Sequence, residues 1–142
     1  MSRLTLDIAK AMIEHAEHEA HQIGVPMVIS VVDEGGNLVA FHRMDDALLV
    51  SIDIAQNKAW TSVALKMPTA NLAEASAPGA ELYGINTTNN GRVILFGGGI
   101  PLCSENRIIG AVGVSGGSVE QDVRVAEAAV KSFETMMVDA GA

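Results

Sequence analysis

The sequence has few of the residues that mark secreted, nucleic-acid-binding or membrane proteins. It contains one cysteine, so no disulfide forms within the chain and an oxidising compartment is not indicated. Lys and Arg total 9 against 17 Asp and Glu, which gives a net charge of -8. Nucleic acids and anionic membranes are bound through clustered basic side chains, so neither is expected as a partner. No apolar run has the length of a signal-peptide core or a membrane-spanning helix, and the sequence therefore predicts a cytoplasmic protein.

Aromatic residues are also scarce, at 4% of the chain, whereas 49% of the residues are hydrophobic and 14 are glycine. A chain of 142 residues with this apolar content is expected to fold as one domain, residues 1–142. Its core must then be aliphatic, with glycines at the turns. Deep ligand pockets are usually lined by aromatic side chains, so we expect any ligand site to be shallow or shared between subunits.

Apolar residues at intervals of three and four predict four helices. The expected ranges are 6–23, 47–66, 69–75 (capped by Thr69) and 118–137. Thr5 or Ser2 is expected to cap the first helix, and Gly24 to end it. Ser118 and Gln121 have the spacing of a capping box at the start of the last helix.

Runs of β-branched residues predict strands between these helices. The expected ranges are 27–33, 38–43, 93–96 and 107–114, with a further strand near 82–85 left open. The first two flank Gly35 and Gly36, which predicts an antiparallel hairpin. Gly110 and Gly113 leave room for a close neighbour on the last strand. Strand pairs joined by hairpins and flanked by helices predict an α+β fold with an antiparallel sheet.

Three histidines on the first helix, His15, His18 and His21, are candidates for cofactor binding. Residues three apart are neighbours on a helix surface, so adjacent histidines can share a ligand. At about 100° per residue, His18 lies nearly opposite the apolar stripe and the other two flank it. The pattern fits either a cofactor-binding face or a solvated face shared with the glutamates of that helix. If His18 is a ligand, its site is open or is completed by another subunit.

Two glycine-rich turns are candidates for anion binding. They contain Gly97, Gly98 and Gly99 in the first turn and Gly116 and Gly117 in the second. Successive backbone N–H groups in the first turn can cradle an anion, and the second turn precedes a helix N-terminus. Asp122 in the first turn of that helix would repel an anion, and both turns can equally be structural.

Arg43 and Lys58 are candidates to hold a carboxylate-bearing ligand. In the alternative interpretation, Arg43 pairs with Asp45 or Asp53 and fixes the turn. The sequence contains no nucleophile-elbow motif and no metalloprotease motif, and we assign no catalytic residue and no metal site.

Several segments, in order along the whole chain, resemble the GlcG/HbpS-like family, which is described as haem-degrading or haem-binding and is related to the C-terminal domain of PduO-type proteins. The matching segments are 32–41, 43–45, 55–59 with Lys58, 67–69, 97–101, 109–117 and 121–122. The resemblance implies a profilin-like fold, assembly into a homo-oligomer, and haem as cofactor. It places His18 first as an axial ligand, with His15 and His21 as competitors. Asp46 stands where the family commonly has glycine, which disfavours an anion held by Arg43.

Three functional hypotheses follow from these observations. The first is a haem- or tetrapyrrole-binding accessory protein, linked to glycerol, propanediol or glycolate metabolism. The second is a small enzyme that acts on a carboxylate-bearing metabolite. The third is a structural or regulatory partner of a corrinoid-dependent dehydratase. The sequence does not decide whether the protein is an enzyme.

Overall fold

The computed structural model describes residues 3–141, which form four helices and four strands. The helices and strands are α1 (Leu6–Ile23), β1 (Val28–Asp33), β2 (Leu38–Arg43), α2 (Val50–Leu65), α3 (Leu72–Ala75), β3 (Gly99–Ser104), β4 (Arg107–Ser115) and α4 (Val119–Gly141). Three 3-10 turns span Thr69–Asn71, Ile85–Thr87 and Asn89–Gly91.

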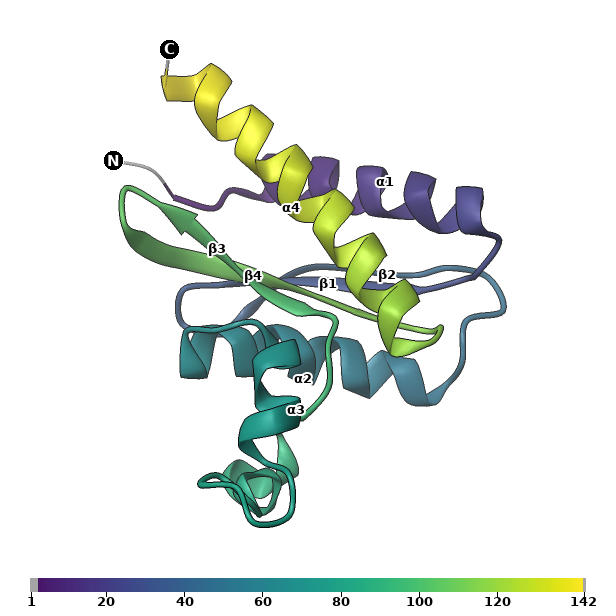
Figure 1. The fold of residues 1–142 in the computed structure, drawn as a ribbon. Coiled ribbons are helices and arrows are strands. Elements are labelled where there is room, and N and C mark those ends of the chain that lie inside the picture. The colour runs from purple at the N-terminus through teal and green to yellow at the C-terminus, as the bar shows by residue number, and fades with distance from the viewer. Residues whose placement is uncertain (1–2, 142) are drawn as a thin grey trace.

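The four strands form one antiparallel sheet in the order β2-β1-β4-β3. Helices α1 and α4 cover one face of the sheet, and α2 covers the other (Figure 1). The predicted α+β fold, an antiparallel sheet flanked by helices, is therefore confirmed. Among the helices described here, none is long and apolar enough to cross a membrane.

The helix ends follow the predicted capping chemistry. The Thr5 hydroxyl accepts a hydrogen bond from the Ile8 N–H at 3.2 Å, and Gly24 ends α1 with a φ of 70°. Ser2, the alternative cap, lies outside the described residues. Before α4, the Ser118 N–H donates to the Gln121 side chain at 2.9 Å and the Gln121 N–H donates to the Ser118 hydroxyl at 3.2 Å. The predicted capping box is confirmed.

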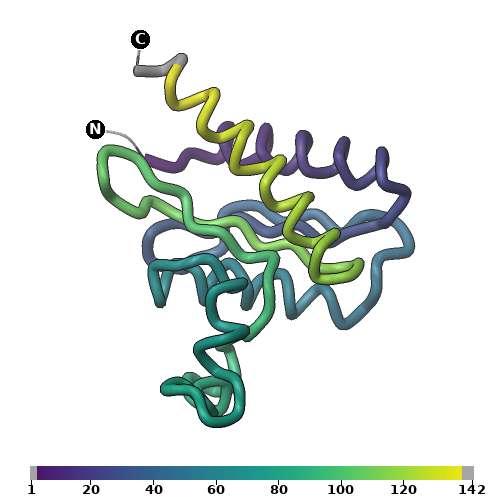
Figure 2. Tube along the Cα trace, viewed as in Figure 1, coloured from purple at the N-terminus to yellow at the C-terminus, as the bar shows by residue number. Residues whose placement is uncertain are grey.

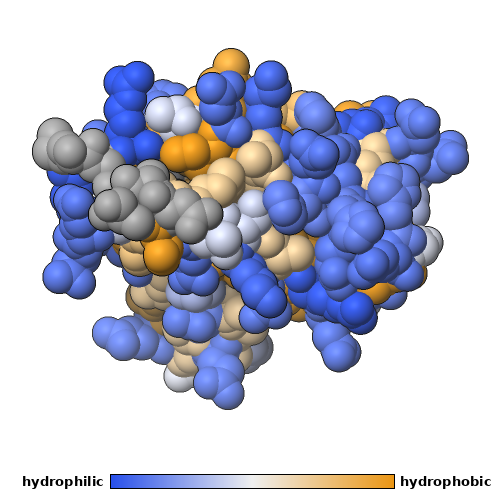
Figure 3. Space-filling model, turned by 90° about the horizontal axis from the view of Figure 1, so that it is seen from above, coloured by the Kyte–Doolittle hydropathy of each residue, from blue (hydrophilic) through white to orange (hydrophobic). Residues whose placement is uncertain are grey.

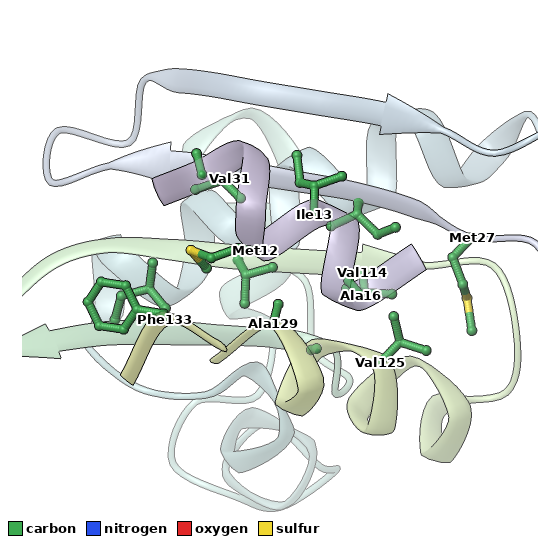
Figure 4. Close-up of a cluster of buried hydrophobic side chains, with 14 of the residues drawn as sticks. Met12, Ile13, Ala16, Met27, Val31, Val114, Val125, Ala129 and Phe133 are labelled. Carbon is green, nitrogen blue, oxygen red and sulfur yellow. The ribbon is translucent and has the colours of Figure 1, made fainter. Parts of the chain in front are cut away.

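The main core lies between the sheet and the helix pair α1 and α4 (Figure 4). Its buried side chains are aliphatic or methionine apart from Phe133, as the scarcity of aromatic residues predicts. On the opposite face, α2 packs directly on β4 at Gly113, where a Cβ atom would collide with the backbone of Ala55 and Ala59. The predicted close approach at this glycine is confirmed.

The helix predicted over 47–66 is confirmed as α2, which begins at Val50 after a turn. Two other predictions for the middle of the chain are wrong, and the strand left open near 82–85 does not form. Residues 93–96 are not a strand, because the Ile94 N–H donates to the Thr61 hydroxyl of α2 at 3.1 Å instead of to a strand. Residues 82–85 form turns rather than a strand. Thr69 does not cap a helix, because its hydroxyl accepts a hydrogen bond from the Gly99 N–H at 2.9 Å.

The segment that connects α3 to β3 projects from the body of the molecule on the side of α2 (Figure 2). Its turns are closed by local hydrogen bonds, such as those from the Thr87 hydroxyl to the Gly84 carbonyl at 2.7 Å and from the Thr88 hydroxyl to the Ile85 carbonyl at 2.6 Å. Tyr83 in this segment is exposed. The projection ends where the chain returns to α2 and enters β3 through the first glycine turn.

Candidate functional site

A buried ion pair lies where the two glycine turns meet. Lys58, on α2, is fully buried, and its ammonium donates to the Asp122 carboxylate at 3.0 Å and to the Val114 carbonyl at 2.8 Å. The ring of Phe96 lies 4.9 Å from the ammonium nitrogen. Asp122, in the first turn of α4, also accepts a hydrogen bond from the Gly117 N–H at 2.9 Å. The pair therefore joins α2, β4 and α4.

Burial dominates the electrostatics of this pair. Desolvation lowers the pKa of Lys58 and raises the pKa of Asp122, because burial removes the water that would stabilise the charged form of each group. The attraction and hydrogen bond between the two groups oppose both pKa shifts, and the Gly117 and Gly116 N–H groups further oppose the rise in the pKa of Asp122. Lys58 is already engaged with a carboxylate of its own chain and has no exposed surface with which to meet a ligand.

Two glycines of these turns, Gly98 and Gly116, lie where a Cβ atom would not fit. A Cβ atom on Gly98 would lie 2.6 Å from the Lys58 ammonium nitrogen, and one on Gly116 would lie 2.6 Å from the Pro26 carbonyl oxygen. The Gly117 N–H, a candidate donor to an external anion, donates instead to the Asp122 carboxylate. The anion at this helix N-terminus is thus the chain's own carboxylate.

The structure does not bring Arg43 and Lys58 together, so the predicted shared carboxylate site is wrong. Lys58 is buried beside Asp122, whereas Arg43 is exposed at the end of β2. The alternative pairing of Arg43 with Asp45 or Asp53 is also wrong. Instead, the Arg43 Nε and Nη2 atoms donate to the Ala47 carbonyl at 3.3 and 2.8 Å.

The three candidate histidines are all exposed on α1, but their surroundings differ. His15 faces α4, where its Nδ1 lies 3.1 Å from the Ser132 hydroxyl. His18 lies on the outer surface, with its Nε2 3.1 Å from the Gln22 side-chain nitrogen. His21 turns toward β2 and lines a groove. The histidines therefore span the outer face of α1 from the α4 side to the β2 side.

The groove beside His21, here called the α1 groove, has a volume of about 530 Å³. Its walls come from the last turns of α1, the loop to β1 and the end of β2. Its lining side chains include His21 and Arg43, the apolar Val25, Pro26 and Met44, and three carboxylates, Glu17, Asp45 and Asp46. The groove therefore combines an imidazole, a guanidinium, apolar side chains and carboxylates, and it is open to solvent.

The face over α1 and α4 is largely hydrophilic, with hydrophobic side chains in a band between the charged ones (Figure 3). Within the part of the chain that the structure describes, no three His, Cys, Asp or Glu side chains converge to hold a metal ion.

The sequence did not reveal that Lys58 and Asp122 pair in the core. The position of Asp122 in a helix first turn indicates a carboxylate favoured by the helix dipole and a charge that repels anions, but not a lysine partner. A lysine between Ala55 and Ala59, two core positions of the same predicted helix, was the available signal that an acidic partner lies in the core.

Comparison with known proteins identifies the family. A model of the family described as "Haem degrading protein HbpS-like" matches residues 4–131. A Citrobacter freundii protein, "Uncharacterized 15.0 kDa protein in dhaT-dhaS intergenic region", is 47% identical over 136 residues, which cover 96% of each chain. A "Corrinoid adenosyltransferase PduO" of the same organism is 50% identical over 114 residues, which are 80% of this chain and only 34% of that protein.

A solved structure described as "PduOC:Heme Complex" superposes with a TM-score of 0.90. It is 42% identical in sequence, and the match covers 92% of this chain and 95% of that one. The family match spans most of the chain, and these relatives agree with it in sequence and in fold. This chain therefore belongs to the HbpS-like family.

Proposed function

We propose that this protein binds haem and acts as an accessory protein rather than as a metabolic enzyme. The observation that carries the proposal is the row of exposed histidines on α1 in a chain that is 42% identical to a protein solved as a haem complex. No metal cluster competes for these side chains among the described residues.

The residues present on this face fit a haem group. Imidazole is a common axial ligand of haem iron, and a free imidazole nitrogen on α1 needs no rearrangement of the core to meet one. The α1 groove supplies apolar contacts from Val25, Pro26 and Met44 beside His21. A bound haem would supply an iron centre with redox and ligand-binding chemistry, and the chain's part is to hold and orient it.

His18 is the first candidate for the axial ligand. It points away from the core, and its hydrogen-bond partner, Gln22, is an exposed side chain that can move aside. His15 is held between the Ala11 carbonyl at 2.9 Å and the Ser132 hydroxyl at 3.1 Å, which makes it less free. His21 lies in the last turn of α1 within the groove and is the main competitor.

A haem titration followed by the Soret band tests this proposal. We expect the wild-type protein to shift the band and to bind haem in a saturable way. His18→Ala should weaken binding at least about tenfold, because the bond to the iron is lost. His15→Ala and His21→Ala separate the competitors, and whichever variant shows the largest loss identifies the ligand.

His42→Ala is the matched control. His42 is an exposed histidine on β2 whose Nδ1 lies 3.2 Å from the Glu17 carboxylate. Its loss removes one imidazole that contacts Glu17 at the groove and leaves all three histidines of α1 in place, so haem affinity should stay within about twofold. A band that does not shift with wild-type protein refutes haem binding. A shift that is equal in all four variants refutes ligation by α1.

We also propose that the protein works as a homo-oligomer near a corrinoid-dependent enzyme. The groove and the histidines are open on one side, which suits a site completed by a second copy. The identity to part of a corrinoid adenosyltransferase supports the metabolic setting. Light scattering of the purified protein tests the first point, and co-purification with a dehydratase subunit tests the second.

A further inference from the structure

Arg43 carries a positive charge that no carboxylate neutralises by contact. Its guanidinium is fixed at the end of β2 by two hydrogen bonds to one neutral acceptor, the Ala47 carbonyl. Asp45 and Asp46 are near in sequence, yet neither forms an ion pair with it in the part of the chain described here. A guanidinium has five N–H donors, so donors remain for a further acceptor.

This fixed guanidinium lines the same groove as His21. Both side chains border the α1 groove of about 530 Å³, together with the apolar Val25, Pro26 and Met44. A ligand in this groove would thus meet an imidazole, apolar side chains, the carboxylates of Glu17, Asp45 and Asp46, and one arginine whose orientation is set before binding. Arginine pairs with carboxylates through two parallel N–H donors, which fixes the orientation of the bound group.

We propose that Arg43 binds a carboxylate of the ligand, and that this carboxylate is a propionate of haem. The inference rests on the proposed haem binding and deepens it, because it defines the ligand as a tetrapyrrole with free carboxylates. Corrinoids carry amides where haem carries propionates, and a neutral amide gains far less from a guanidinium. Arg43 therefore selects haem over an amidated corrinoid of similar size.

The acidic side chains that line the groove repel a bound propionate and so weaken the preference for haem. Glu17 is already engaged with His42 at 3.2 Å. Asp45 and Asp46 are exposed, so water screens their repulsion of a bound propionate. Asp46 has a φ of 68°, a conformation that asparagine adopts readily, which makes Asp46→Asn a variant that removes one charge without straining the turn.

The test compares haem with haem dimethyl ester, in which both propionates are neutral. With wild-type protein we expect haem to bind about tenfold more tightly than the ester, as loss of one charge-assisted contact predicts. Arg43→Gln should weaken haem binding to the level of the ester and leave the ester unchanged. Asp46→Asn should strengthen haem binding by about twofold to threefold and leave the ester unchanged.

Arg107→Gln, which changes an exposed arginine on β4 near Glu34, is the matched control and should leave both affinities unchanged. Arg43→Lys keeps the charge and should retain part of the preference for haem, and thermal unfolding checks that each variant folds.

Equal binding of haem and ester by wild-type protein would overturn the inference while leaving haem binding intact. Glycolate, a second carboxylate source, should compete with haem and not with the ester, and only when Arg43 is present, because both carboxylates need the same guanidinium. If wild-type protein binds neither porphyrin, the proposed function itself fails.

Discussion

Replacing Lys58 with methionine should destabilise the protein by about 3–5 kcal/mol at pH 7. Methionine fills much of the same volume, but it leaves the Asp122 carboxylate 4% exposed and without its ammonium partner. Removing one member of a buried ion pair is costly because the remaining charge is uncompensated in a low-dielectric site. The double variant with Asp122→Asn should recover much of this loss, since asparagine still accepts the hydrogen bond from the Gly117 N–H.

The loss caused by Lys58→Met should depend on pH in a defined direction. Burial already raises the pKa of Asp122 above its usual value, and removing Lys58 removes an influence that lowers it. When the pKa of a carboxyl group is higher in the folded state than in the unfolded state, the folded protein binds more protons. Its free energy of unfolding then falls as the pH rises above the unfolded pKa, about 3.9. The variant should therefore lose less stability at pH 5 than at pH 7.

Chemical denaturation at the two pH values measures both effects. Lys10→Met, on the exposed surface of α1, is the matched control and should change the unfolding free energy by less than about 0.5 kcal/mol. A Lys58→Met variant as stable as wild type, or one that is more stable at pH 7 than at pH 5, would show that the pair does not hold α2, β4 and α4 together.

Replacing Gly113 with alanine should destabilise the protein by about 3 kcal/mol or prevent folding. The added Cβ would press on the Ala55 carbonyl and lie 2.6 Å from the Ala59 N–H nitrogen, both in the backbone of α2. A helix backbone cannot move aside as a side-chain tip can. The Ala55 carbonyl also accepts the hydrogen bond from the buried Ser30 hydroxyl at 2.8 Å, which a shift of α2 would stretch.

The unfolding free energy of Gly113→Ala should be compared with that of Gly35→Ala. Gly35 has no left-handed backbone conformation, and its added Cβ would meet the tip of the exposed Asn37 side chain rather than a backbone atom. We expect the Gly35 variant to stay within about 1 kcal/mol of wild type. Equal stability of the two variants would mean that α2 can separate from β4 without cost.

Local patterns predicted most of the fold because they depend on neighbouring residues. Thr5, Gly24 and the Ser118–Gln121 pair act within one turn of a helix, and the hairpin around Gly35 and Gly36 closes over a few residues. The strand expected at residues 93–96 does not form, because the Ile94 N–H donates to the Thr61 hydroxyl, more than thirty residues earlier in the chain, instead of to a strand. A β-branched run alone does not show which partner its backbone will find.

The candidate site was less predictable because its side chains meet only in the folded chain. Lys58 and Asp122 are 64 residues apart, and nothing in their spacing indicates contact. Arg43 was identified as a carboxylate-binding residue, but its partnership with Lys58 was wrong because α2 turns Lys58 into the core. The histidines follow helical spacing and were placed correctly on the exposed face of α1, while their assignment as ligands stays a prediction.

The absorbance spectrum of the protein purified from cells supplied with haem tests the central claim most directly. The cell then offers haem together with every competing tetrapyrrole and metabolite, so the ligand that co-purifies is the one the site prefers. We expect a Soret band from the wild-type protein and a much weaker one from His18→Ala purified in the same way. Colourless wild-type protein, or a spectrum typical of a corrinoid, would contradict haem binding by this chain.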